Sequence, residues 1–140
     1  MRFVDTNVLI YAASRATADP ERRHRARALL SEPNLAVSVQ VLQEFYHQAT
    51  RPTRRDCLSH GQALKFLEPI LTLPVQAMTV EIFQAAAIIS HRFRLSYWDG
   101  AILAAARLAG CGAVYSEDFS AEQDYGGLRI INPFTDAGAD

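Results

Sequence analysis

The sequence has very little of two residue types: Lys65 is its only lysine, and Cys57 and Cys111 are its only cysteines. The cysteines lie far apart in the chain and form no CxxC spacing, so they predict neither a disulfide framework nor a zinc site. We therefore expect a reducing location, with the cytoplasm as the default. The GxGxxG fingerprint and the GKS or GKT loop are also absent, which argues against dinucleotide and nucleoside-triphosphate enzymes.

Long apolar runs and a strong net charge are missing as well. No run approaches the roughly 18 apolar residues that a membrane span needs. The first residues, MRFVDTNVLIYAA, carry Asp5 and Asn7 where a signal peptide needs an apolar core. The formal net charge is −1, so no overall positive field favours nucleic acid or an anionic membrane. We expect neither export nor membrane insertion, and any nucleic-acid binding must come from a local arrangement of side chains.

The composition that is present fits one globular domain. Hydrophobic residues make up 49% and charged residues 21% of the 140 residues, which supplies enough apolar surface for a core without cross-links. No internal repeat or low-complexity segment divides the chain. We expect a single domain over residues 1–134, followed by a frayed tail, TDAGAD, at residues 135–140.

Short β-branched stretches alternate with longer helical patterns, which is typical of an α/β fold with a parallel sheet of about five strands. The predicted strands are Arg2–Val4, Leu35–Val37, Ile70–Val75, Ala113–Tyr115 and Leu128–Ile131. Helices are predicted from cap residues and apolar periodicity. They begin at Asp19-Pro20, run from about Thr79 to Phe93, follow Asp99 as far as Gly110, and cover Thr53–Leu67.

Carboxylates occupy the same structural place in four separate segments. Each one directly follows a predicted strand, opens a helix, or lies in the first turns of the helix after a strand. They are Asp5 in VDTNVLIY, Glu44 in VLQEFYHQ, Asp99 in SYWDGAILAAA and Asp118 in VYSEDFS. Because the carboxyl ends of parallel strands and the following helix starts share one edge of the sheet, we expect the four acids to meet there.

An acidic cluster of this kind suits a hard divalent cation, since Mg²⁺ and Mn²⁺ prefer carboxylate oxygens and water. Without a cation, two unit charges about 4 Å apart repel by roughly 4 kcal/mol at an effective dielectric near 20. The site should therefore bind cations or raise its carboxyl pKa values. Bound ions can ionise a water and stabilise charge on a phosphodiester. Setting the four acids aside changes the net charge from −1 to +3, so the remaining chain is slightly basic. The cluster predicts metal-dependent phosphodiester hydrolysis.

Three of these segments, VDTNVLIY, YWDGAILAAA and SEDF, resemble in their order and spacing the PIN domain family, specifically its small VapC-type ribonuclease toxins. The resemblance spans essentially the whole chain. It implies a three-layer α/β/α sandwich around a parallel sheet and an endoribonuclease that depends on Mg²⁺ or Mn²⁺. It also implies an RNA substrate, a homodimer, and inhibition by the cognate antitoxin of a toxin–antitoxin pair.

The resemblance also assigns residues to the site. It carries metal binding and catalysis onto the four acids, Asp5, Glu44, Asp99 and Asp118. Thr6 and Asn7 are expected to add supporting hydrogen bonds in the same pocket. Glu117 stands next to Asp118 and is the alternative for the fourth acidic position, for which Asp118 is preferred.

Each acid taken alone has an ordinary structural interpretation. Asp5 and Asp99 lie where helix N-caps are expected, Glu44 fits a solvated surface position, and Asp118 fits a turn. Only the joint pattern favours a catalytic site. The main alternative is a PIN-like module that binds RNA or protein without cleaving. Phosphotransfer onto Asp5 is disfavoured, because such enzymes use a late lysine that Lys65 does not match.

Arginines gather in two places. The first cluster is Arg22, Arg23 and Arg25 with Arg27, and the second is Arg51, Arg54 and Arg55 around Pro52. Such runs are usually solvated faces, but arginine also pairs bidentately with phosphate, so both clusters are candidates for RNA-backbone contacts. The aromatic residues near the acids are expected mostly in the core, with base stacking as the alternative. These are Tyr11, Tyr46, Tyr97 and Trp98.

Overall fold

The computed structural model describes residues 1–15, 19–121 and 123–135. Within these residues, five short strands form one parallel sheet in the order β3-β2-β1-β4-β5. The strands are β1 (Arg2–Val4), β2 (Leu35–Ser38), β3 (Val75–Gln76), β4 (Ala113–Tyr115) and β5 (Arg129–Ile131). The predicted α/β class with a five-stranded parallel sheet is confirmed.

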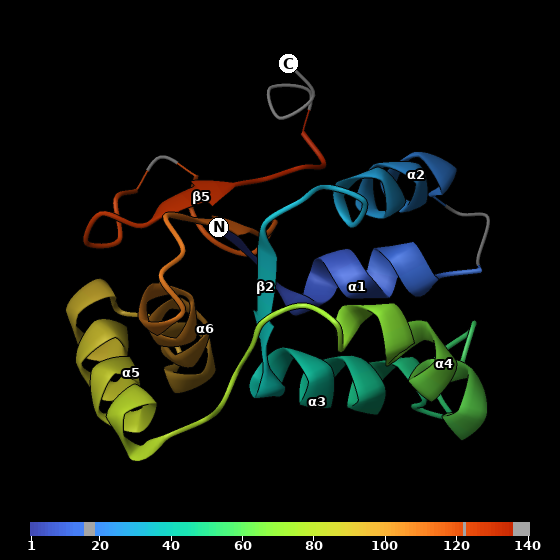
Figure 1. Cartoon of the computed structure of the whole chain (residues 1–140), viewed down its shortest axis with the longest axis horizontal. Helices are drawn as coiled ribbons and strands as arrows, with labels where there is room; N and C mark the ends of the chain where they lie inside the picture. Colours follow the sequence, from blue (N-terminus) through green and yellow to red (C-terminus); the bar gives the residue numbers. More distant parts are fainter. Residues whose placement is uncertain (16–18, 122, 136–140) are drawn as a thin grey trace.

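Helices cover both faces of this sheet. They are α1 (Thr6–Ala13), α2 (Pro20–Leu29), α3 (Val39–Ala49), α4 (His60–Ile70), α5 (Val80–Phe93) and α6 (Tyr97–Leu108). Helices α5 and α6 lie on one side of the sheet and α1 to α4 on the other, which gives three layers (Figure 1). Because both faces are covered, strand residues such as Val37 and Val114 are fully buried.

The strand order reverses at β1, which pairs with β2 on one side and β4 on the other. Phe3 lies opposite Ala36 of β2 and Val114 of β4. In open parallel sheets, ligands bind beyond the carboxyl ends of the strands at such a reversal. Asp5 leaves β1 at this point and caps helix α1.

The predicted strand over Ile70–Val75 is wrong for most of its length: helix α4 runs through Pro69 to Ile70, and residues 71–74 form the turn and connection before β3. Leu67 and Ile70 are buried on one face of that helix, and this packing favours helix over strand. Strand β3 consists only of Val75–Gln76.

Two predicted helix starts also differ from the structure. The predicted helix over Thr53–Leu67 begins only at His60, because Ser59 and Gln62 form a capping box that fixes the start there. Helix α6 is capped by Ser96 rather than by Asp99, whose backbone N–H donates to Ser96 Oγ at 3.1 Å.

The other helix starts agree with the prediction. Asp19 caps α2 through the backbone N–H of Arg22, and Thr79 caps α5 through that of Ile82. The predicted tail lies outside the described residues, apart from Thr135.

Candidate metal centre in an acidic cleft

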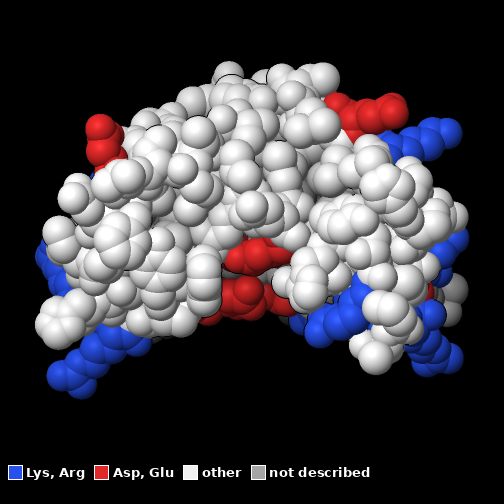
Figure 2. Space-filling view, turned by 90° about the horizontal axis from the view of Figure 1, so that it is seen from below, with Lys and Arg blue, Asp and Glu red and all other residues white. Residues whose placement is uncertain are grey.

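A cleft of about 340 Å³ opens at the carboxyl edge of the sheet. Its walls include the four predicted acids, Asp5, Glu44, Asp99 and Asp118. They come from the end of β1, from α3, from α6 and from the loop after β4. Figure 2 shows carboxylates gathered in a central hollow of this face, with Lys and Arg side chains toward its margins. The fold therefore brings together the acids that the sequence placed at one sheet edge.

Asp5 lies deepest, with only 5% of its surface exposed. Its Oδ1 accepts the backbone N–H of Thr6 at 2.7 Å, and its Oδ2 accepts the hydroxyl of Ser116 at 2.7 Å. Burial raises the pKa of this carboxyl to about 7, and the negative charges of Asp118 and Glu44 add to the rise. Asp5 therefore serves as a helix cap and is protonated in part near neutral pH.

Asn7 connects two of the acids across the cleft. Its Nδ2 donates to Asp118 Oδ2 at 3.0 Å and to Ser116 Oγ at 3.1 Å, and it lies 3.5 Å from Asp5 Oδ2. Its Oδ1 is buried and has no hydrogen-bond partner within the part of the chain that the structure describes. One amide therefore holds two carboxylates in place and leaves an oxygen acceptor unused.

Glu44 is fixed through both carboxylate oxygens. Thr6 Oγ1 donates to Oε2 at 3.0 Å, and Gln40 Nε2 donates to Oε1 at 2.6 Å. Gln40 also donates to the carbonyl of Trp98 at 3.1 Å, so it links α3 to the first turn of α6. The surface interpretation of Glu44 does not hold, because this carboxylate is held on two sides.

Asp99 lies in the first turn of α6 and is partly buried. Burial raises the pKa of the Asp99 carboxyl above its ordinary value. A side-chain hydrogen bond with Ser96 lowers this pKa, and the negative charges of Asp118 and Glu44 raise it. Capping does not account for Asp99, because Ser96 caps this helix. The Asp99 side chain instead lines the acidic cleft.

The two adjacent acids after β4 have different partners. Asp118 is joined to Asn7, whereas Glu117 Oε1 accepts the hydroxyl of Tyr11 at 2.8 Å. Both line the cleft. Of these two acids, only Asp118 is joined to Asn7 and raises the pKa values of Asp5 and Asp99, so the geometry favours Asp118 for the fourth acidic position.

Three candidates for RNA binding on α2, Arg22, Arg23 and Arg25, do not line the acidic cleft. Arg22 stacks over the ring of Tyr11, with its guanidinium carbon 5.4 Å from the ring centre. Arg25 pairs with Glu21 at 2.8 Å and donates to the carbonyl of Thr135 at 3.1 Å, so it anchors the C-terminal segment to α2. Arg23 is half-buried on the same helix. Of all the arginines in the two clusters, Arg54 is the one that lines the cleft.

Two features of the site were not predicted. Gln40 carries a signal in the sequence, because it stands four residues before Glu44 and so shares its helix face. The hydroxyl of Ser116 carries none, because its contact with Asp5 depends on where distant segments meet. Arg54 was a candidate for RNA contact as part of its cluster, and the fold decides that it lines the cleft while Arg51 and Arg55 do not. Trp98 is 64% exposed, so it is not among the aromatic residues in the core.

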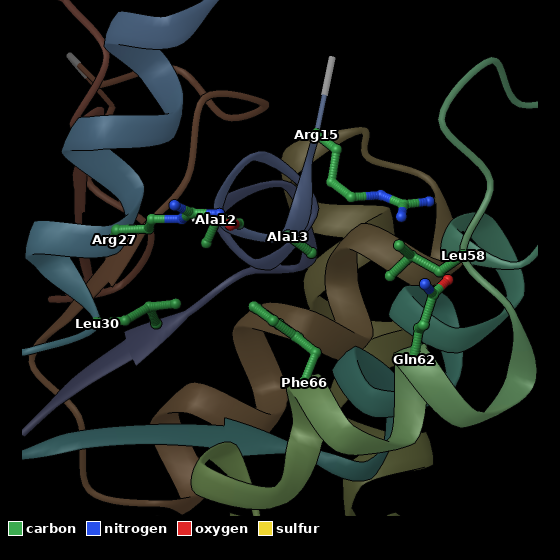
Figure 3. Close-up of a pocket in the computed structure, with 8 residues that line it drawn as sticks. All are labelled: Ala12, Ala13, Arg15, Arg27, Leu30, Leu58, Gln62 and Phe66. Atoms are coloured by element: carbon green, nitrogen blue, oxygen red, sulfur yellow. Dashed lines mark hydrogen bonds between the residues drawn. The ribbon is translucent and has the colours of Figure 1, made fainter. Parts of the chain in front are cut away.

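A second cavity, of about 390 Å³, lies among α1, α2 and α4 (Figure 3). Its lining is mainly apolar, with Leu30, Leu58 and Phe66 facing it. Arg27 Nε donates to the carbonyl of Ala12 at 2.9 Å on one wall. No carboxylate lines this cavity among the described residues. It therefore lacks the carboxylates that metal-dependent hydrolysis needs, although it is similar in size to the acidic cleft.

The donor set of the acidic cleft fits a hard divalent cation, because carboxylate and amide oxygens are preferred ligands and Asn7 Oδ1 is an unused buried acceptor. Among the described residues, no three His, Cys, Asp or Glu side chains already lie close enough together to hold one ion. Mg²⁺ keeps several waters and usually binds through one or two carboxylates, so a hydrated ion does not require such a group.

Comparison with known proteins defines the class. The model of the PIN domain family matches residues 2–123. The chain belongs to the PIN domain family. No curated protein matches the chain by sequence.

Solved structures of toxin proteins share this fold. A toxin–antitoxin complex from Klebsiella pneumoniae superposes with a TM-score of 0.72 at 18% identity, covering 96% of this chain and 98% of the other. VapC20 from Mycobacterium tuberculosis, titled a sarcin-ricin loop cleaving toxin, superposes with a TM-score of 0.65 at 22% identity, covering 87% of this chain and 92% of the other. The DNA-bound VapBC of Salmonella typhimurium superposes with a TM-score of 0.63 at 19% identity, covering 92% of this chain and 95% of the other. The predicted three-layer PIN-like architecture is confirmed.

No helix within residues 1–15, 19–121 and 123–135 is both long and apolar enough to cross a membrane.

Proposed function

We propose that the chain is an endoribonuclease that depends on Mg²⁺ or Mn²⁺ and acts as the toxin of a toxin–antitoxin pair. The observation that carries the proposal is the convergence of Asp5, Glu44, Asp99 and Asp118 on one cleft. In chemical terms, the reaction is attack of a water on a phosphodiester. We propose that a single domain over residues 1–134 performs it, and we place it in the cytoplasm, where cellular RNA is translated.

The cation would be held by carboxylates of the acidic set. When bound, it supplies a Lewis acid that ionises water and stabilises charge on the phosphate. The chain's own residues do the positioning: Asn7 keeps Asp5 and Asp118 together, and Gln40 and Thr6 hold Glu44. Burial keeps Asp5 protonated in part near neutral pH, so cation uptake there releases a proton.

The direct test is cleavage of total RNA by the purified chain in Mg²⁺ or Mn²⁺, with and without a chelator, beside Asp99→Asn. This variant removes a charge from the cleft without touching the cap of α6, which Ser96 provides. We expect discrete, metal-dependent fragments from the wild type and none from the folded variant. Equal cleavage by both proteins, or metal-independent cleavage, contradicts the proposal.

The alternative is a PIN-like module that binds RNA or protein without cleaving it. Retention of RNA by the wild type in a gel-shift assay, with no cleavage in either metal, would favour this alternative. The intact set of four acids in the cleft favours the nuclease instead, because a binding module has no use for repelling carboxylates beside a phosphate backbone.

An antitoxin partner is proposed from the family and from the neighbours, several of which are toxin–antitoxin complexes. The apolar cavity among α1, α2 and α4 offers space for side chains of such a partner, and Arg15 and Arg27 there favour acidic ones. A homodimer is proposed from the family and from an exposed apolar face. Phe83, Tyr97 and Trp98 form a continuous row of rings there, with Phe83 and Trp98 57% and 64% exposed.

A further inference from the structure

Arg54 stands out in the acidic cleft because of its charge. It lies in the loop between α3 and α4. Among the described residues that line the cleft it is the one cation, beside five carboxylates. Its neighbours in the same cluster, Arg51 and Arg55, are exposed and do not line the cleft.

The guanidinium of Arg54 is fixed on one edge. Its Nε lies 2.9 Å from Asp56 Oδ1, and the Arg54 side chain is only 27% exposed. Asp56 is itself held, because its Oδ2 accepts the hydroxyl of Ser14 at 2.7 Å and the backbone N–H of Arg15 at 3.3 Å. The loop arginine is therefore tied to the end of α1, which reduces the conformational entropy that it would lose on binding a ligand.

The other edge of the guanidinium is unused. Within the described part of the chain, Asp56 is the one hydrogen-bond or ion-pair partner of the Arg54 side chain, and this contact runs through Nε rather than through the terminal nitrogens. These nitrogens are the edge with which arginine pairs bidentately with phosphate oxygens. In a cleft of carboxylates, a phosphodiester meets repulsion unless positive charge lies beside it. Arg54 supplies such a charge at a fixed place on the wall.

We propose that Arg54 binds a backbone phosphate of the RNA at the wall of the acidic cleft, with Asp56 presenting the unused edge of its guanidinium. This inference rests on the proposed function, since it names the group that receives the substrate of that site. Arg54 is then a substrate-binding residue, and Asp56 is a positioning residue. The contact is to phosphate, so it strengthens binding of any RNA sequence to a similar degree.

The test measures the affinity of a fluorescent 12-nucleotide single-stranded RNA over a series of salt concentrations in the presence of a chelator, so that the RNA stays intact. The variants are Arg54→Gln, Arg54→Lys and the matched control Arg51→Gln from the same loop. Loss of one phosphate contact to a single strand reduces the slope of log Kd against log salt by about 0.7. We expect this reduction and a weaker Kd for Arg54→Gln, a near wild-type slope for Arg54→Lys, and no change in slope for Arg51→Gln.

An Arg54→Gln slope equal to that of the wild type overturns the inference, as does an equal loss in Arg51→Gln. The melting temperature of each variant, measured in the same buffer, checks that it is folded. Cleavage by the wild type in Mg²⁺ or Mn²⁺ is recorded separately. A wild type that binds without cleaving, with a reduced slope in Arg54→Gln, supports the phosphate contact while the proposed nuclease fails. A wild type that cleaves, with unchanged slopes in all variants, retains the nuclease and rejects the contact.

Discussion

Burial and neighbouring negative charges both raise the pKa of Asp5. Its folded pKa of about 7 lies above the ordinary value of 3.8, so the folded protein binds a proton that the unfolded chain releases at lower pH. Its contribution to stability therefore decreases as pH rises from about 4 to about 7 and is constant above that range. In chelator, we expect the melting temperature to fall between pH 5 and pH 8, and to fall less in Asp5→Asn. An identical pH dependence in both proteins would contradict the burial of this charge.

Gln40 gives a second prediction for a single side chain. Replacing it with Met keeps its length but removes the amide that holds Glu44 and the carbonyl of Trp98. Loss of a residue that orients a metal-binding carboxylate typically costs about 10- to 100-fold in activity. We expect such a loss of kcat in metal-dependent cleavage, with little change in KM. Gln43→Met is the control, because Gln43 is exposed on the same helix. Equal activity of the two variants would show that Glu44 needs no support from Gln40.

The residue types and the spacing predicted the four acids as neighbours, and the resemblance to the PIN domain family added Thr6 and Asn7. The pattern of carboxylates at strand ends and in the first turns of helices depends only on local sequence and on the parallel sheet. Ser116 could not be predicted, because its hydroxyl reaches Asp5 across 111 positions of sequence. The choice between Glu117 and Asp118 likewise depends on which side chain meets Tyr11 and which meets Asn7.

Among the secondary-structure elements, cap residues marked most helix starts correctly, although Asp99 did not, because Ser96 caps α6. Asp19 and Thr79 begin helices where predicted, because one side-chain oxygen satisfies an unpaired backbone N–H in the first turn. The apolar run after Leu67 was ambiguous, since a short buried segment can be helix or strand. Tertiary packing decides it, and α4 takes Ile70 into its last turn despite Pro69. Sequence periodicity alone cannot supply that information.

The contact between α5 and α6 depends on Gly100. A Cβ at this position would lie 2.7 Å from the carbonyl oxygen of Ala86 and 2.9 Å from the Cβ of Ser90. We expect Gly100→Ala to reduce the free energy of unfolding by about 1–3 kcal/mol, because backbone has to move to admit the methyl group. Gly61→Ala is the matched control, since a Cβ there meets nothing within 4 Å. Urea unfolding measures both variants, and equal midpoints would contradict close packing of the two helices.

For the molecule as a whole, we expect the exposed aromatic face of Phe83, Tyr97 and Trp98 to form the interface of the proposed homodimer. Phe83→Glu places a charge in the row of rings and should shift the protein from dimer to monomer in light scattering after size exclusion. Leu71→Glu is the control, because Leu71 is also 57% exposed but lies at the end of α4. A wild type that is monomeric at micromolar concentration, or dimers in both variants, would reject this face as the interface.

The pairing of β1 with β4 also has a consequence for synthesis of the chain on the ribosome. Strand β1 pairs with a strand that begins only at Ala113, and Asp118 follows that strand. An unfinished chain that ends before β4 therefore carries three of the four acids but lacks the segment that completes the cleft. A nascent chain thus gains its full acidic site only after β4 and Asp118 have been synthesised and folded against β1, which separates the making of the first three acids from the destruction of RNA proposed for the protein.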